Sequence, residues 1–243
     1  MTNNIKLLIW IFALTPLIYG SYLFFWTIGL MPESLRGLVG EKVADPVKFI
    51  LDLSAITAVQ FLIASLLVTP FKKFLKFNLI KQRRLLGLWA FAYALIHFSL
   101  FLMQLFLDTG FDPESIYEEL IKKPFIFIGL LAFLILLFMA LTSFKKLYAK
   151  FVKWHKLVYV AIMLIAIHFM MSQKILSFTE GIYIFVFILL LLVRMQILLA
   201  SLITMALHYK VVMINEWWHL LTYVLIIIAF IILGARNNKR GYL

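Results

Sequence analysis

The chain has 243 residues, of which 65% are hydrophobic, and this composition excludes a soluble globular domain of the same size. Several apolar runs exceed about 18 residues, the length that is typical of a membrane-spanning helix. The formal net charge of +12 does not indicate a nucleic-acid partner, because the basic residues lie in loops between apolar runs, where membrane topology explains them.

Six apolar segments in turn predict membrane helices. They extend over about residues 7–30, 49–69, 84–107, 124–144, 154–173 and from 182 onward. Pro70 is expected to end the second helix. Before the fourth helix, Asp112-Pro113-Glu114 predicts a short surface helix, because acidic residues and an early proline favour a helix N-terminus. The predicted fold class is an all-α integral membrane protein, a polytopic helical bundle of six core transmembrane helices with one or two extra C-terminal hydrophobic segments.

The loops between the first five helices alternate in charge. The loop after the second helix has six basic residues and no acidic one, and the loop after the fourth has five lysines. The loop after the first helix is balanced, and the loop after the third has five acidic residues against two lysines. By the positive-inside rule the two basic loops face the cytoplasm, which also places the N-terminus inside.

The segment after Arg194 allows three arrangements. Residues 197–214 could cross outward and residues 217–235 return, residues 182–207 could form one long tilted helix, or residues 197–214 could lie along the membrane surface. The first arrangement places the basic C-terminus inside, in agreement with the positive-inside rule, and we favour it.

Two of the predicted helices carry a histidine at the same depth. His97 follows Arg83 by fourteen residues and His168 follows His155 by thirteen, so each lies about 20 Å beyond the cytoplasmic end of its helix. A charge-capable side chain deep in an apolar helix is costly and indicates a functional site. The chain has no cysteine, which excludes thiolate metal sites and c-type haem attachment. The matched pair predicts a haem between the two helices, although a single membrane histidine could also simply bond neighbouring helices.

Arg83, Arg84 and His155 form a second level at the cytoplasmic ends, so two haems could lie in series. Arg83 and His97 share a helix face, because fourteen residues turn about 1400°, close to four full turns. Thirteen residues leave about 140° between His155 and His168, so His155 needs a bent or frayed first turn, or serves a different site. His155 could also be a solvated interfacial residue. The arginines are either topogenic charges or partners of haem propionates, a flavin phosphate or a quinone headgroup.

Four stretches of the chain resemble the MsrQ (YedZ) family, the haem-binding membrane subunits within the ferric-reductase-like transmembrane superfamily. They are ADPVK at Ala44–Lys48, LLVTP at Leu66–Pro70, RRLLGLWAFAYALIH at Arg83–His97 and HKLVYVAIMLIAIHF at His155–Phe169. The resemblance covers about residues 10–194. It implies a ferric-reductase-like transmembrane haem-binding domain over residues 1–194, followed by a hydrophobic extension with a basic tail over residues 195–243.

The resemblance also implies a multi-pass subunit of the bacterial inner membrane that binds one or two haem b groups and is associated with FMN. Electrons from quinol would pass outward to a periplasmic molybdopterin reductase, an MsrP-like protein that repairs methionine sulfoxide in envelope proteins. On this resemblance His97 and His168 are the outer haem ligands, and His155 belongs to the other haem. Arg83 stands where two-haem members of the superfamily have a histidine, which leaves the second inner ligand open.

The sequence has no G-x-G-x-x-G motif and no soluble tail that would indicate a fused nicotinamide- or flavin-binding domain. Electrons are therefore expected from quinol or from a separate reductase, and the chain would be a non-catalytic electron-transfer subunit embedded in membrane lipid. Two alternatives stay open. One is a transmembrane ferric or cupric reductase, and the other is a transporter-like or structural membrane protein whose histidines relay protons or pack.

Overall fold

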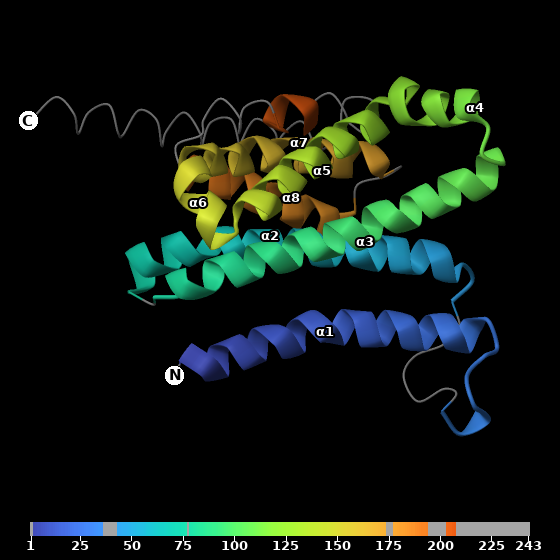
Figure 1. The fold of residues 1–243 in the computed structure, drawn as a ribbon, viewed down its shortest axis with the longest axis horizontal. Helices are drawn as coiled ribbons and strands as arrows, with labels where there is room; N and C mark the ends of the chain where they lie inside the picture. Colours follow the sequence, from blue (N-terminus) through green and yellow to red (C-terminus); the bar gives the residue numbers. More distant parts are fainter. Residues whose placement is uncertain (1, 36–42, 77, 174–176, 194–202, 208–243) are drawn as a thin grey trace, which may run out of the picture. The chain divides into compact units, whose positions relative to one another are not determined.

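The computed structural model describes residues 2–35, 43–76, 78–173, 177–193 and 203–207. Every regular element among these residues is a helix (Figure 1). The chain divides into two compact units, Met1–Ile116 and Tyr117–Leu243, each with its own helix packing.

The first unit is built from three long helices, α1 (Thr2–Thr27), α2 (Pro46–Leu75) and α3 (Arg83–Thr109). Short 3-10 turns, Glu33–Leu35 and Ile80–Gln82, lie in the two connections. The closest packing is between α2 and α3, and α1 lies alongside α2 (Figure 1). The buried Tyr93 of α3 donates a hydrogen bond to the Ala13 carbonyl of α1, which ties the outer helix to the pair.

Local sequence sets both ends of α2. The Asp45 side chain accepts a hydrogen bond of 2.9 Å from the Lys48 backbone N–H, and Pro46 occupies the first helical position. The helix ends at Lys76, which has a left-handed backbone with φ of 57°. The prediction that Pro70 ends this helix is wrong, because Pro70 lies inside it. A proline interrupts only one backbone hydrogen bond, and membrane helices tolerate this where neighbouring helices support them.

The predicted short surface helix is confirmed as α4 (Pro113–Tyr117). The Asp112 carboxylate caps its start, because it accepts a hydrogen bond of 2.9 Å from the Ser115 backbone N–H and another from the Ser115 hydroxyl. A π-helical turn, Glu118–Lys122, follows it.

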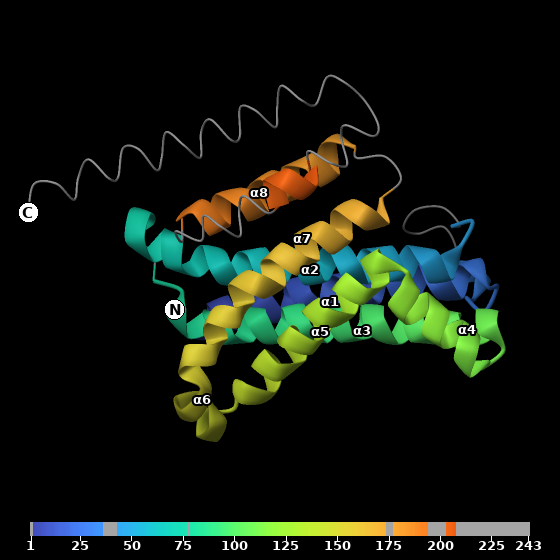
Figure 2. The ribbon, with the colours of Figure 1, turned by 90° about the horizontal axis from the view of Figure 1, so that it is seen from above.

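The second unit contains α5 (Pro124–Thr142), α6 (Lys145–Phe151), α7 (Val158–Ser172) and α8 (Phe178–Val193). A 3-10 helix, Val152–Leu157, leads into α7. α7 lies between α5 and α8 and packs most closely on α5 (Figure 2). The apolar pattern predicted that the fifth helix begins at residue 154, but the α-helix begins four residues later, at Val158. The residues before it form the more tightly wound 3-10 helix.

The helices confirm the predicted fold class, a polytopic all-α membrane protein. Five helical stretches are long and apolar enough to cross a membrane: Asn4–Thr27, Pro46–Lys72, Ile80–Thr109, Pro124–Thr142 and Lys146–Ser172. The sixth predicted helix is present as the shorter apolar helix α8. The three arrangements considered for the C-terminal extension depend on residues 194–202 and 208–243, which lie outside the described part of the chain.

Candidate functional site

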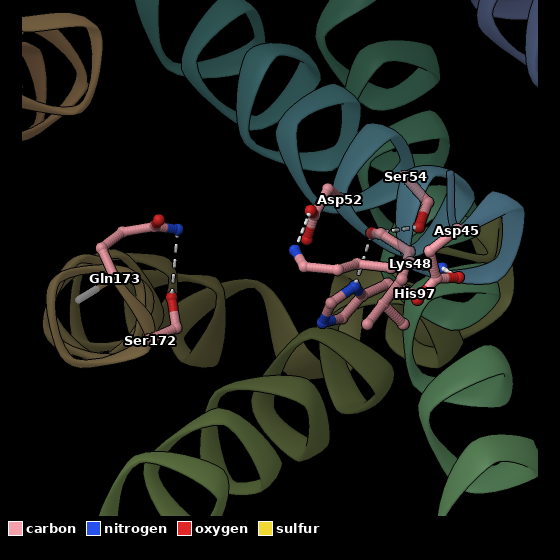
Figure 3. A network of polar contacts seen from close by, with 8 residues as sticks. Asp45, Lys48, Asp52, Ser54, His97, Ser172 and Gln173 are labelled. Carbon is pink, nitrogen blue, oxygen red and sulfur yellow. Dashed lines mark hydrogen bonds and ion pairs between the residues drawn. The ribbon is translucent and has the colours of Figure 1, made fainter. Parts of the chain in front are cut away.

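His97 lies on α3 in the first unit and faces the backbone of α2. Its Nδ1 is 3.0 Å from the Leu51 carbonyl oxygen (Figure 3). His97 is half-buried. The same carbonyl accepts a 2.9 Å hydrogen bond from the buried Ser54 hydroxyl. A carbonyl oxygen can only accept, so Nδ1 carries the proton and the lone pair of the neutral imidazole is on Nε2.

An ion pair lies on α2 beside this contact. Lys48 Nζ and Asp52 Oδ2 are 2.6 Å apart, one helical turn from each other (Figure 3). Their side chains are 66% and 56% exposed, so the pair contributes at most about 1 kcal/mol to stability. Asp52 directly follows the residue whose carbonyl binds His97, which makes it the acidic residue nearest to this imidazole along α2.

His168 lies on α7 in the second unit and faces the backbone of α5. Its Nδ1 is 2.7 Å from the Phe125 carbonyl oxygen, so the proton is again on Nδ1 and the lone pair on Nε2. The imidazole also stacks on the Phe125 ring, with centroids 6.3 Å apart and planes inclined by 25°. A Cβ added to Gly129 of α5 would lie 2.7 Å from both Cε1 and Nδ1 of this imidazole.

The two units thus present a histidine in the same way. In each, the histidine is on the later helix of a packed pair, and the acceptor is a carbonyl near the start of the earlier helix. Imidazoles that ligate a metal through one nitrogen generally donate the other N–H to a carbonyl or carboxylate, which fixes the tautomer and raises ligand basicity. The donor chemistry of His97 and His168 therefore fits an axial ligand of haem iron.

The described residues contain no group of three or more histidine, aspartate or glutamate side chains that could hold a metal ion. A metal ion bound by side chains alone needs such a group. Haem iron needs only one or two protein ligands, because the porphyrin supplies the others. A single histidine on each unit therefore suits haem iron better than a metal ion that is bound by side chains alone.

His155 lies in the 3-10 helix that precedes α7, so it is not on a regular first turn of an α-helix. Its Nε2 is 3.3 Å from the hydroxyl of the buried Thr142, and its ring meets Tyr148 edge-on at 5.0 Å. A 3-10 helix turns about 120° per residue and an α-helix about 100°. Three of the thirteen steps from His155 to His168 are in the 3-10 helix and ten are in α7, so the angle between the two side chains falls from about 140° to about 80°. His155 therefore lies closer to the His168 face of the helix than an unbroken α-helix would place it.

Arg83 and Arg84 begin α3. The Arg83 side chain is half-buried and its backbone carbonyl accepts a 3.3 Å hydrogen bond from the Ser65 hydroxyl of α2. Arg84 is exposed. Both arginines lie on the same continuous helix as His97, about 20 Å away from it along the axis. Along α3 the two arginines and His97 therefore occupy separate levels.

Three contributors to these sites are absent from the sequence predictions: the carbonyls of Leu51 and Phe125, and Gly129. A backbone carbonyl has no signature in a sequence because every residue has one. Gly129 did offer a signal, since it is a lone glycine in the apolar run of α5.

Comparisons with known proteins bear on the same region. The family model for the ferric reductase like transmembrane component matches residues 53–166, which include His97 and His155. Proteins of Brucella ovis and Brucella canis, each named protein-methionine-sulfoxide reductase heme-binding subunit MsrQ, are 40% identical to this chain over 156 residues. The matched region covers 61% of this chain and 70% of each relative.

The chain belongs to the MsrQ family. This membership confirms the family that the four sequence stretches indicated, and it places the chain among the ferric-reductase-like transmembrane proteins. No solved structure matches the chain.

Proposed function

We propose that the chain is the haem b-binding electron-transfer subunit of a methionine-sulfoxide reductase system in the bacterial inner membrane, with His97 and His168 as iron ligands. The observation that carries this proposal is the pair of Nδ1–carbonyl contacts, 3.0 Å at His97 and 2.7 Å at His168, which direct the lone pair to Nε2 in both residues. The relatives' names, which describe heme-binding subunits of protein-methionine-sulfoxide reductases, support the same function.

Bound haem would supply one-electron exchange between iron(III) and iron(II). The histidines would hold the iron, while the Leu51 and Phe125 carbonyls fix the tautomers of their rings and the apolar helices limit access of water. In the full reaction a quinol loses two electrons and two protons. Methionine sulfoxide takes up two electrons and two protons and yields methionine and water. The chain therefore conducts two electrons in sequence, and the sulfoxide chemistry belongs to the periplasmic MsrP-like molybdopterin partner.

The cytoplasmic level of the molecule is proposed as the point of electron entry. Arg83 and Arg84 begin α3, and His155 precedes α7, so each unit offers basic or ligating side chains at this level. Guanidinium groups bind anions bidentately, which suits haem propionates, the FMN phosphate or the oxygens of a quinone headgroup. His155 is the proposed ligand of a second haem, with its partner still open.

Absorption spectra of the purified chain test the proposal. Oxidised and dithionite-reduced spectra with a pyridine haemochrome count should show b-type haem. His97→Ala and His168→Ala should each abolish binding of one haem, whereas the exposed control positions Leu95→Ala on α3 and Met171→Ala on α7 should leave the haem content unchanged. Retention of all haem in both histidine variants would refute the proposed ligands.

The electron donor and acceptor need separate measurements. Quinol added to the oxidised protein should reduce its haem, and an MsrP-like reductase with methionine sulfoxide should reoxidise it. His155→Ala, Arg83→Gln and Arg84→Gln should slow the first step and leave the second unchanged. Rapid reoxidation by ferric chelates or cupric ions, with none by the reductase, would favour the alternative of a metal-ion reductase, which the superfamily description also fits.

A further inference from the structure

Gly129 of α5 lies against the imidazole of His168, closer than any other residue type would allow. A Cβ built on Gly129 would be 2.7 Å from Cε1, 2.7 Å from Nδ1 and 3.2 Å from Cγ of His168. We propose that Gly129 is a positioning residue, which lets His168 approach α5 closely enough to bond the Phe125 carbonyl and so holds the ligand ring in place. This inference rests on the proposed role of His168 as a haem ligand.

The contact cannot be relieved by a small adjustment of a flexible side-chain end. Carbon atoms pack at about 3.5–4.0 Å, so the ring would have to move away by about 0.8–1.3 Å. The affected atoms include Cγ, which joins the ring to its Cβ, and the ring is already held by the 2.7 Å bond from Nδ1 and by stacking on Phe125. Where this displacement carries Nδ1 away from the Phe125 oxygen, it lengthens the 2.7 Å bond to about 3.5–4.0 Å, which is at or beyond the limit of a hydrogen bond.

The Phe125 carbonyl and Gly129 lie next to each other on α5 and act on the same imidazole. Residues four apart in an α-helix lie above one another, so Phe125 and Gly129 share a face of α5. In an α-helix the carbonyl of residue 125 points along the axis toward the N–H of residue 129. A side chain on residue 129 would stand beside this oxygen, and a glycine leaves the approach open for Nδ1 of His168.

The first unit offers an internal comparison. The Leu51 carbonyl, which bonds His97, is followed four residues later by Ala55 and not by glycine. The bond from His97 Nδ1 is 3.0 Å, against 2.7 Å at His168. The Leu51 carbonyl also accepts from the Ser54 hydroxyl, so that histidine shares its acceptor. His168 has the closer approach, and only that approach requires a residue without a Cβ.

Gly129→Ala in the full-length protein, purified in detergent with its haem, tests this inference. Loss of a partner that orients a metal-binding histidine typically weakens metal affinity by 10- to 100-fold, and we expect this loss for the haem at His168. The low-spin signal of that haem in electron paramagnetic resonance should shift or convert to high spin. Gly181→Ala in α8 is the matched control in the same unit, because a Cβ there meets no atom within 4 Å.

A second pair of variants separates positioning from helix packing. In His168→Ala with added imidazole, the ligand is no longer attached to α7, so Gly129→Ala should have no further effect on the haem spectrum. The double variant should also fold as well as His168→Ala, because the clash is with the imidazole. A spectral or folding defect of Gly129→Ala that persists without His168 would overturn the inference.

The outcomes also separate this inference from the proposed function. If His168→Ala keeps all its low-spin haem, the proposed ligand itself is wrong. If His168→Ala loses haem while Gly129→Ala keeps the wild-type affinity and spectrum, the ligand stands and the positioning role of Gly129 is refuted.

Discussion

Alanine substitutions at two glycines of the second unit should change the stability of the haem-free protein in opposite directions. Gly129 lies in the second turn of α5 and Gly181 at the end of the first turn of α8. Alanine is more favourable than glycine by up to about 1 kcal/mol in a helix interior. At Gly181 the new methyl group meets no atom within 4 Å, so Gly181→Ala should stabilise the protein by about 0.5 kcal/mol.

At Gly129 the same gain in helix propensity is outweighed. The new methyl group would lie 2.7 Å from two atoms of the His168 ring. Overpacking of this kind costs about 1–3 kcal/mol, and loss of the Nδ1–carbonyl bond leaves a half-buried donor and acceptor to find other partners, at up to about 1–3 kcal/mol. If the ring moves away, the steric overlap is relieved but the hydrogen bond is lost, so the two costs do not add. Gly129→Ala should therefore destabilise the protein by about 1–2 kcal/mol net.

Equilibrium unfolding in mixed detergent micelles, followed by circular dichroism without haem, measures both changes. His168→Ala provides the control background, because removal of the imidazole removes the clash and Gly129→Ala should then be neutral or stabilising. Equal and stabilising effects of alanine at both glycines in the wild-type background would show that α5 and α7 do not approach each other as closely as the structure places them.

Three further predictions concern groups outside these glycines. Tyr93→Phe should destabilise the first unit by about 0.5–1.5 kcal/mol in the same unfolding assay, because it removes a buried hydrogen bond to α1. Lys48→Met and Asp52→Asn should each change stability by less than about 1 kcal/mol, since their ion pair is exposed; a larger loss would place the pair in the core. Hydrogen bonds from the Ser115 hydroxyl, and then from its backbone N–H, hold the pKa of Asp112 below its ordinary value. A depressed pKa in the folded state means that the capping contribution is present above the ordinary pKa and is lost as the pH falls through the folded pKa. The protection factors of the amides at the start of α4, which are corrected for the intrinsic exchange rate, should therefore fall at acid pH, and Asp112→Asn should remove that dependence.

The apolar pattern predicted the order of the long helices and their approximate bounds, because in a membrane each spanning segment must satisfy its own backbone. The apolar pattern did not predict where α2 ends or that the segment after α5 is helical. Pro70 carries the strongest stop signal in α2, yet the helix continues to Leu75. The lysine-rich segment after α5 reads as a charged loop, but it folds into α6 and a 3-10 helix.

The candidate site was predictable in its side chains and not in its supports. His97 and His168 are conspicuous in a sequence because each is a titratable residue in an apolar run. Their acceptors are backbone carbonyls on another helix, 46 and 43 residues away along the chain, and no pattern in the sequence marks them. For His155 the helical phase left two alternatives, a bent or frayed first turn or a different site; the structure has a 3-10 helix there, and the role of His155 stays a prediction.

An apolar environment explains part of this architecture without any cofactor. A buried imidazole N–H left without an acceptor is costly in a membrane, so a histidine that merely packs would also bond a carbonyl. Such a histidine needs an acceptor, but it does not need its ring fixed in one place against α5. The glycine costs up to about 1 kcal/mol in helix propensity and gains a short bond that fixes the ring against α5. A ligand must hold its Nε2 in one position, whereas a packing residue need not, and the close approach at Gly129 is the support that the proposed ligand role of His168 would require.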